Sequence, residues 1–186
     1  MRKLSVFNLT SLDGYYKGPN GEIDWHKNGP DLQQLSEENL SAGNMLLFGR
    51  VTYDLMASFW PTPQAKQSMP VVAQGMNNAE KIVFSRTLKK ADWNNTIVVS
   101  GDIAAEITEL KQTPGKDMTI LGSGDIITQL AEAELIDEYQ VLISPVAIGA
   151  GTPLFVGISR QLDLRLISTR AFKSGHVLLC YQSIYK

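Results

Sequence analysis

The segment Leu46-Leu47-Phe48-Gly49-Arg50-Val51-Thr52 decides the fold, because an apolar run turns through one glycine into a helical stretch. The segment Ile120-Leu121-Gly122-Ser123-Gly124-Asp125 repeats that order further along the chain. A short apolar run that ends at a glycine is typical of a strand buried on both faces of a parallel sheet. Two such strand-to-helix units predict an α/β fold built around a mostly parallel sheet.

These two corners also predict a site for an anionic ligand. Glycine lets the backbone approach a ligand closely, and the N-terminus of a helix presents unpaired N–H groups to it. We expect the corners at Gly49 and Gly122 to face each other across one crevice that holds the pyrophosphate of a dinucleotide. The alternative at residues 120–125 is an ordinary glycine-rich turn. Asp125 counts against an anion unless it caps the helix with its side chain outside the site.

Two pairs of a hydroxyl and a guanidinium group follow the predicted strands. Arg50 falls in the first turn of a helix, where it can bind a phosphate in a bidentate manner, and Thr52 can donate a hydroxyl. Ser85 and Arg86 form the second pair, at the end of another strand. Two such pairs fit the extra phosphate that distinguishes NADPH from NADH. The alternative for Arg50 is an exposed arginine with no partner.

Hydrophobic periodicity and turn residues predict the other elements. Strands are expected at residues 4–10, 45–48, 81–85, 96–100, 118–121 and 137–144, and helices at residues 31–42, 51–58, 102–111 and from the second glycine corner to 133. Residues 17–30 read as a long loop and residues 61–79 as irregular surface chain. The stretches 164–172 and 177–185 alternate well enough to pair as a C-terminal antiparallel hairpin. No break in composition suggests a second domain, so residues 1–186 are expected to form one.

Composition excludes several classes of function. The chain has 186 residues, of which 44% are hydrophobic and 19% charged, as in ordinary soluble globular proteins. Its formal net charge of −2 gives no long-range attraction to nucleic acid or to an anionic membrane. No run approaches the roughly 18 apolar residues of a membrane helix, and polar residues such as Asn8 interrupt the N-terminal apolar stretch too early for a signal peptide. We therefore expect a cytoplasmic protein.

The few cysteines and histidines make a metal site or a disulfide unexpected. Cys180 is the only cysteine, and it lies in an apolar run where a buried, inert thiol is expected. His26 and His176 have no neighbouring cysteine or histidine at ligand spacing, so we expect no metal.

The motifs together resemble a known family almost from end to end. The chain resembles the dihydrofolate reductase superfamily, and within it the branch that contains the reductase domain of riboflavin biosynthesis. The stretches that carry this resemblance are Ser11-Leu12-Asp13-Gly14, residues 47–53, Val83-Phe84-Ser85-Arg86, residues 120–130, Leu135-Ile136-Asp137-Glu138-Tyr139 and residues 143–149.

The resemblance implies a three-layer fold of the dihydrofolate reductase type, a homodimer, and NADPH as the cofactor. It implies hydride transfer to a small heterocyclic or imine-like substrate, with 5-amino-6-(5-phosphoribosylamino)uracil reduction as the candidate reaction. By position, the adenosine and its phosphate would meet Gly49, Arg50, Thr52, Ser85 and Arg86. The pyrophosphate and nicotinamide would meet Leu121, Gly122, Ser123, Gly124 and Ile126.

A proton donor is harder to assign from the resemblance. Dihydrofolate reductases carry one acidic residue at the start of the helix that follows a mobile loop and a tryptophan. Asp31 and Trp25 stand at comparable places here, although their spacing differs. A buried Asp31 would have a raised pKa and could pass a proton; the alternative is that it only caps the helix after Pro30. Asp13 is either a turn residue or a substrate contact, and Trp25 is either a lid over the substrate or part of the core.

Two other functions stay open at this point. The chain could bind a nucleotide without turnover, or it could be a true dihydrofolate reductase, against which the spacing around Asp31 argues. The bifunctional riboflavin enzymes carry a zinc deaminase domain ahead of the reductase, and we expect no such domain here because the chain lacks its residues and its length.

Overall fold

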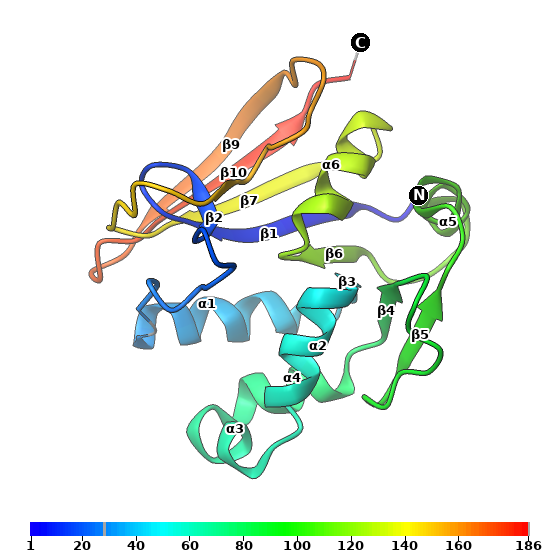
Figure 1. The fold of residues 1–186 in the computed structure, drawn as a ribbon, viewed down its shortest axis with the longest axis horizontal. Helices are drawn as coiled ribbons and strands as arrows, with labels where there is room; N and C mark the ends of the chain where they lie inside the picture. Colours follow the sequence, from blue (N-terminus) through cyan, green and yellow to red (C-terminus); the bar gives the residue numbers. More distant parts are fainter. Residues whose placement is uncertain (28, 186) are drawn as a thin grey trace.

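A central sheet of eight strands runs through the molecule, with helices on both faces (Figure 1). The computed structural model describes residues 1–27 and 29–185. In spatial order the strands are β5 (Thr96–Val99), β4 (Lys81–Phe84), β3 (Met45–Gly49), β6 (Met118–Leu121), β1 (Leu4–Thr10), β7 (Glu138–Ile143), β10 (Val177–Ser183) and β9 (Leu164–Ala171). Neighbouring strands from β5 to β7 are parallel, whereas β10 pairs antiparallel with both β7 and β9. The predicted α/β fold with a C-terminal antiparallel hairpin is confirmed.

Six helices and a small second sheet surround the central sheet in the described part of the chain. The helices are α1 (Pro30–Ser41), α2 (Arg50–Phe59), α3 (Pro63–Ser68), α4 (Pro70–Asn78), α5 (Ile103–Gln112) and α6 (Gly124–Glu132). The second sheet pairs β2 (Tyr15–Lys17) with β8 (Thr152–Pro153). None of the helices formed by the described residues is both long and apolar enough to cross a bilayer.

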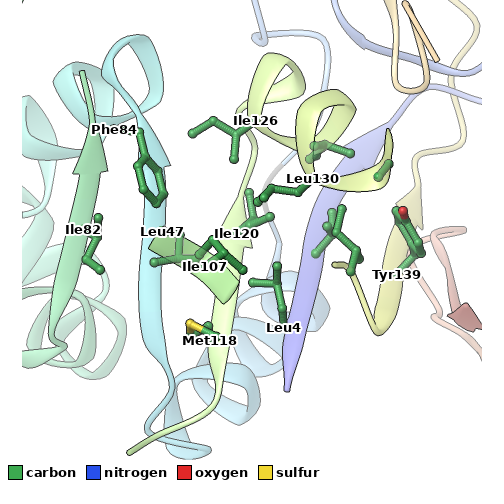
Figure 2. Packing of buried hydrophobic residues seen from close by; sticks show 14 of the residues in the cluster. Leu4, Leu47, Ile82, Phe84, Ile107, Met118, Ile120, Ile126, Leu130 and Tyr139 are labelled. Carbon is green, nitrogen blue, oxygen red and sulfur yellow. The ribbon is translucent and has the colours of Figure 1, made fainter. Parts of the chain in front are cut away.

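The core lies on both faces of the sheet, and β3 shows why its sequence is apolar throughout. Leu47 points to the face covered by α5 and α6, where it joins a cluster with Ile107 and Ile126 (Figure 2). Its neighbours Leu46 and Phe48 point to the opposite face and join a cluster with residues of α2 and α4. All three side chains are at most 4% exposed. Burial of each contributes about 1.5–3 kcal/mol, so the strand is held firmly from both sides.

A third cluster fixes α1 near the end of the sheet that carries the hairpin. Leu32 and Leu35 of α1 pack against Leu142 of β7 and Leu178 of β10. Leucines three residues apart lie on one face of a helix, so this short apolar stripe sets the orientation of α1. The first turn of α1 consequently lies beside the turn that joins β9 to β10.

The prediction of irregular chain at residues 61–79 is wrong, because this segment forms α3 and α4. Pro63 and Pro70 occupy first-turn positions, where proline is tolerated because its missing N–H would be unpaired anyway. The Thr62 hydroxyl caps α3 by accepting a hydrogen bond from the Ala65 N–H. Each proline therefore marks the start of a helix here. In a segment with weak hydrophobic periodicity, the same residue is easily read as a helix breaker.

A buried lysine closes the C-terminal end of α4. Lys81 is 1% exposed, and its Nζ donates hydrogen bonds to the carbonyl oxygens of Met76, Asn77 and Ala79 at 2.9, 3.2 and 2.6 Å. The ammonium also lies 4.6 Å from the centre of the Trp93 ring. Burial lowers the pKa of Lys81 to about 8, so the group keeps its proton at neutral pH. A cation at a helix C-terminus is also favoured by the helix dipole.

Replacing Lys81→Met should lower the free energy of unfolding by about 2–4 kcal/mol, because three buried carbonyl oxygens lose their charged donor. Urea denaturation at pH 7 would measure the change. Lys90→Met is the matched control, because the side chain of Lys90 is 84% exposed and should contribute almost nothing. Equal stability of the two variants would show that Lys81 does not cap α4.

Candidate functional site

The two glycine corners lie side by side at the carboxyl edge of the sheet. Strands β3 and β6 are parallel neighbours, so Gly49 and Gly122 come at the same end. The Gly49 N–H donates a hydrogen bond of 2.8 Å to the Ser123 Oγ, which in turn donates to the Leu121 carbonyl oxygen at 3.2 Å. The predicted common location is therefore correct. The corners touch through Ser123, however, and do not stand apart across an open crevice.

Close packing at this contact requires the residues that the sequence provides. Gly122 has a φ of +59°, and a Cβ there would lie 3.3 Å from the Thr52 Cγ2 atom. Ser123 also has a positive φ, of +62°, which is uncommon for a residue with a side chain and costs about 1–3 kcal/mol. The left-handed serine turns its hydroxyl toward β3, away from α6. Gly122 and Ser123 together make the sharp turn from β6 into α6.

Helices α2 and α6 both start without a side-chain cap. Neither Gly49 before α2 nor Ser123 before α6 gives a side-chain hydrogen bond to the helix that follows. By contrast, the Asp102 carboxylate caps α5 by accepting a hydrogen bond from the Ala105 N–H. The exposed Asp125 in the first turn of α6 is not the capping residue. The two neighbouring N-termini therefore present backbone N–H groups at one edge, which is the arrangement that binds phosphate oxygens.

The predicted phosphate-binding side chains follow neighbouring strands at the same edge. Arg50 is exposed and forms an ion pair of 2.9 Å with Asp54 in the next turn of α2. An exposed pair of this kind is weak, so a phosphate could displace Asp54. Ser85, after β4, is buried, and its Oγ accepts hydrogen bonds from the N–H groups of Thr87 and Leu88. Arg86 is exposed beside it.

Tyr16 lies directly in front of the α6 N-terminus. A Cβ on Gly124 would lie 2.4 Å from the Tyr16 hydroxyl oxygen, so the glycine leaves room for the phenol. Tyr16 belongs to β2, which pairs with β8. A ligand that reaches the backbone of Gly124 therefore has to displace the Tyr16 ring.

Asn8 on β1 is a residue that the motif analysis missed. The register pairs Phe7 with Leu121, and the Gly122 N–H donates to the Phe7 carbonyl oxygen, so Asn8 lies next to the glycine turn. Its side chain is buried, with the Nδ2 atom unpaired among the described residues. A buried amide without a partner is costly unless a ligand or water completes it. The signal in the sequence was an asparagine within an apolar strand.

The expected rise in the pKa of Asp31 is wrong. Its carboxylate accepts a hydrogen bond of 2.9 Å from the Ser174 N–H in the turn between β9 and β10. Hydrogen bonds from the Ser174 N–H and hydroxyl hold the pKa of Asp31 below its ordinary value. The helix cap position belongs to Gly29, so Asp31 ties α1 to the hairpin and does not cap the helix. An ionised carboxylate is a poor proton donor at neutral pH.

Asp13 anchors the loop after β1 to the loop after β7. Its carboxylate accepts hydrogen bonds from the N–H groups of Ile148 and Gly149, at 3.2 and 2.7 Å. Bonding to the Ser11 hydroxyl, and then to the Gly149 N–H, lowers the pKa of Asp13. These contacts favour the turn interpretation, and a contact between Asp13 and a substrate stays a prediction.

Trp25 lies against His26, a residue to which the motifs assigned no role. Its ring meets that of His26 edge to face, with centres 5.9 Å apart. The Trp25 Nε1 and His26 Nδ1 atoms are both buried and unpaired among the described residues. His176 and Ser144, which the motif analysis did not propose as site residues either, also carry buried polar atoms.

The sheet order and the C-terminal antiparallel pair define an α/β protein of the dihydrofolate reductase-like fold. The chain belongs to the RibD C-terminal domain family, whose model matches residues 2–178. It is 32% identical, over 97% of its length and 94% of the relative's, to the uncharacterized protein YyaP of Bacillus subtilis (strain 168).

Several solved structures have a similar fold. A putative riboflavin biosynthesis protein from Shewanella sp. PV-4 has a TM-score of 0.76 at 23% identity, with 98% of this chain and 99% of that one covered. A diaminohydroxyphosphoribosylaminopyrimidine deaminase/5-amino-6-(5-phosphoribosylamino)uracil reductase from Thermotoga maritima has a TM-score of 0.69 at 15% identity, over 98% of this chain and 57% of that one. Dihydrofolate reductase from Enterococcus faecalis, solved with NADP(H), has a TM-score of 0.67 at 17% identity. The match covers 97% of this chain and 96% of that one. Two of these three structures, those from Thermotoga maritima and Enterococcus faecalis, are of proteins named as reductases.

The contact between Tyr16 and Gly124 can be tested by a double-mutant cycle. Gly124→Ala should lower the free energy of unfolding by about 1–3 kcal/mol in the wild-type background, because the new methyl group meets the phenol. In a Tyr16→Ala background the same change should be neutral or stabilising, since alanine suits a helix better than glycine. Urea denaturation of the four proteins would measure the coupling. Additive effects would mean that the ring does not lie against Gly124.

Proposed function

We propose that this protein is an NADPH-dependent reductase of a small heterocyclic or imine-like substrate, with 5-amino-6-(5-phosphoribosylamino)uracil as the candidate. The observation that carries the proposal is the pair of uncapped helix N-termini, α2 and α6, joined by the hydrogen bond from the Gly49 N–H to the Ser123 Oγ. The two linked phosphates of a dinucleotide can each be bound by one of two such helix N-termini when these lie close together. The family and the reductase-like neighbours support the same conclusion.

The residues present fit NADPH in several respects. The first N–H groups of α2 and α6 would bind the pyrophosphate, while Arg50 and Arg86 would bind the additional phosphate on the adenosine. The orphaned Asn8 Nδ2 lies beside the glycine turn, where it would donate to an oxygen of the cofactor. When bound, the nicotinamide ring supplies the hydride, and the protein orients it. Within this scheme Tyr16 would leave Gly124 as the cofactor enters.

The reaction is tested by following NADPH oxidation with 5-amino-6-(5-phosphoribosylamino)uracil. Consumption of NADPH that depends on this compound supports the proposal. Binding of NADPH without reduction of this compound or of related pyrimidines would favour a nucleotide-binding module without catalysis. Turnover of dihydrofolate, with inhibition by methotrexate, would make the protein a true dihydrofolate reductase. We propose the cytoplasm as its compartment.

NADPH should stabilise the protein against heat more than NADH does, with a difference in affinity of about tenfold, or roughly 1.4 kcal/mol. Arg50→Ala should remove most of this preference, because it removes one of the two guanidinium groups that meet the extra phosphate. Arg160→Ala is a matched control, since it removes another exposed, ion-paired arginine, which binds Glu134 beyond the C-terminal end of α6. Equal stabilisation by both cofactors in the wild-type protein would contradict the assignment of Arg50 and Arg86.

We also propose that the protein is a homodimer that associates through β9. This strand ends the sheet, is eight residues long and leaves one row of backbone groups without a neighbouring strand among the described residues. Leu166 and Ile167 on it are 51% and 52% exposed, and Ile184 nearby is 48% exposed. A long edge strand with exposed apolar side chains favours pairing with another chain.

Replacing Leu166→Glu should convert the dimer into a monomer, because a carboxylate in an apolar interface is left without a partner. Sedimentation velocity at micromolar protein concentration would measure the change. Val71→Glu on α4 introduces the same charge at a site that is 55% exposed, and it should leave the dimer intact. A monomeric wild-type protein, or a Leu166→Glu variant that stays dimeric, would contradict an interface at β9.

A further inference from the structure

A buried tryptophan anchors the stretch of chain that connects β4 to β5. This connection covers residues 85–95, contains no helix or strand among the described residues, and begins with Ser85 and Arg86. Most of its residues are exposed, but Trp93, near its far end, is only 5% exposed. A segment without regular structure keeps its shape only through its contacts with the rest of the protein. The position of Arg86 therefore depends on how this connection is attached.

Two hydrogen bonds hold Trp93, one through its backbone and one through its side chain. Its backbone N–H donates to the Tyr53 hydroxyl oxygen at 3.2 Å, and its Nε1–H donates to the Asn77 Oδ1 at 2.7 Å. The Tyr53 side chain is buried as well, and the centres of the two rings lie 6.1 Å apart. Hydrogen bonds shielded from water are strengthened by the low local dielectric. Trp93 therefore has a defined position relative to α2 and α4.

Both of these bonds lead back to α2, the helix that begins at Arg50. Tyr53 lies at the end of its first turn. Asn77, on α4, uses the other end of its amide to reach the last turn of α2, because its Nδ2–H donates to the Trp60 carbonyl oxygen at 2.9 Å. The connection is consequently attached to α2 near both ends of the helix. We expect α2 and the connection to behave as one rigid body.

The strand register makes the two guanidinium-bearing segments neighbours. Gly49 of β3 pairs with Phe84 of the parallel strand β4. Arg50 therefore leaves the sheet beside Ser85, with Arg86 one residue further on. Adjacent strands lie about 4.8 Å apart, so two arginines that follow them can reach the same phosphate. Beyond the edge of the sheet, the spacing of the two segments is set by the attachment of the connection to α2.

We propose that Tyr53 and Trp93 are positioning residues that determine the preference for a cofactor with an additional phosphate on its adenosine. This inference rests on the proposed reductase function, which assigns that phosphate to Arg50 and Arg86, and extends it by naming the residues that keep the two guanidinium groups at the right separation. Tyr53 and Trp93 are buried, and they act through the two arginines. NADH lacks the additional phosphate, so its binding does not depend on that separation.

Trp93 also supports the core, so the test has to separate a structural role from a positioning role. Its ring packs against that of Phe48 on β3, with centres 6.0 Å apart, and lies over the Lys81 ammonium. A variant that only loses packing should be less stable and bind both cofactors more weakly to the same extent. A variant in which Arg86 is displaced should bind NADPH more weakly and NADH normally.

Tyr53→Phe removes the hydroxyl oxygen that accepts the Trp93 N–H and keeps the ring. Fluorescence of the reduced nicotinamide would measure the affinity of the full chain for NADPH and for NADH. We expect the variant to bind NADPH about fivefold more weakly and NADH as well as the wild-type protein does. Tyr185→Phe is the matched control, because it also removes a hydrogen-bonded phenol hydroxyl, one that donates to the Ile136 carbonyl oxygen near the C-terminus. It should keep the full preference for NADPH.

A double-mutant cycle tests whether Tyr53 acts through Arg86. Arg86→Ala should weaken NADPH binding about fivefold in the wild-type background and hardly at all in the Tyr53→Phe background, because a displaced guanidinium group contributes little. Trp93→Phe releases the other attachment, since it removes the Nε1–H that Asn77 accepts. This second variant should show the same loss of preference, and it provides the test if Tyr53→Phe does not fold.

The outcomes separate this inference from the proposed function. A wild-type protein that does not prefer NADPH would reject the assignment of Arg50 and Arg86, and the inference with it. A wild-type preference that both Tyr53→Phe and Trp93→Phe retain would reject the inference alone. Equal weakening of NADPH and NADH binding, or additive effects of Tyr53→Phe and Arg86→Ala, would assign the aromatic residues a structural role and also overturn it.

Discussion

The hydrogen bond from the Gly49 N–H to the Ser123 Oγ is the constraint on which the rest of the site depends. It joins the ends of β3 and β6, and through them it sets two helix N-termini at a fixed separation. The hydroxyl that would ordinarily cap α6 is turned toward the neighbouring strand. The same bond therefore aligns two helices and leaves both N-termini without a side-chain cap, and a ligand with two anionic groups gains from both effects.

Several features that cost folding free energy lie together at this edge of the sheet, where a bound ligand would offset their cost. Ser123 holds a positive φ, and Asn8, Ser144 and His176 bury polar atoms without partners among the described residues. Each of these features costs about 1–3 kcal/mol in the free protein. The core can support them because strands such as β3 are packed on both faces. Strain and unpaired groups that gather at one edge are typical of a binding site.

The sequence predicted most of the strands because their residues have few alternatives. The run from Met45 to Phe48 is apolar on every residue, and its short length and the glycine that follows it favour a strand buried on both faces over a buried helix. Residues 61–79 were missed because both of their helices start at prolines and because α3 is only six residues long and buries a single alanine, so its periodicity is weak. The pKa of Asp31 could not be predicted, since it depends on Ser174, far along the chain. His176 and Ser144 carry no motif, and only the register of β7 and β10 brings them together.

The position of Tyr16 indicates which part of the site has to move for a ligand to enter. The backbone around it is held at several points: β2 pairs with β8, and the Asp13 carboxylate binds the N–H groups of Ile148 and Gly149. Moving that backbone would break all of these hydrogen bonds together. Rotating the phenol about its side-chain torsions breaks none of them, and its hydroxyl has only to leave the space in front of Gly124. The physically cheaper route is therefore a change of rotamer within a fixed loop, which a tyrosine side chain completes quickly.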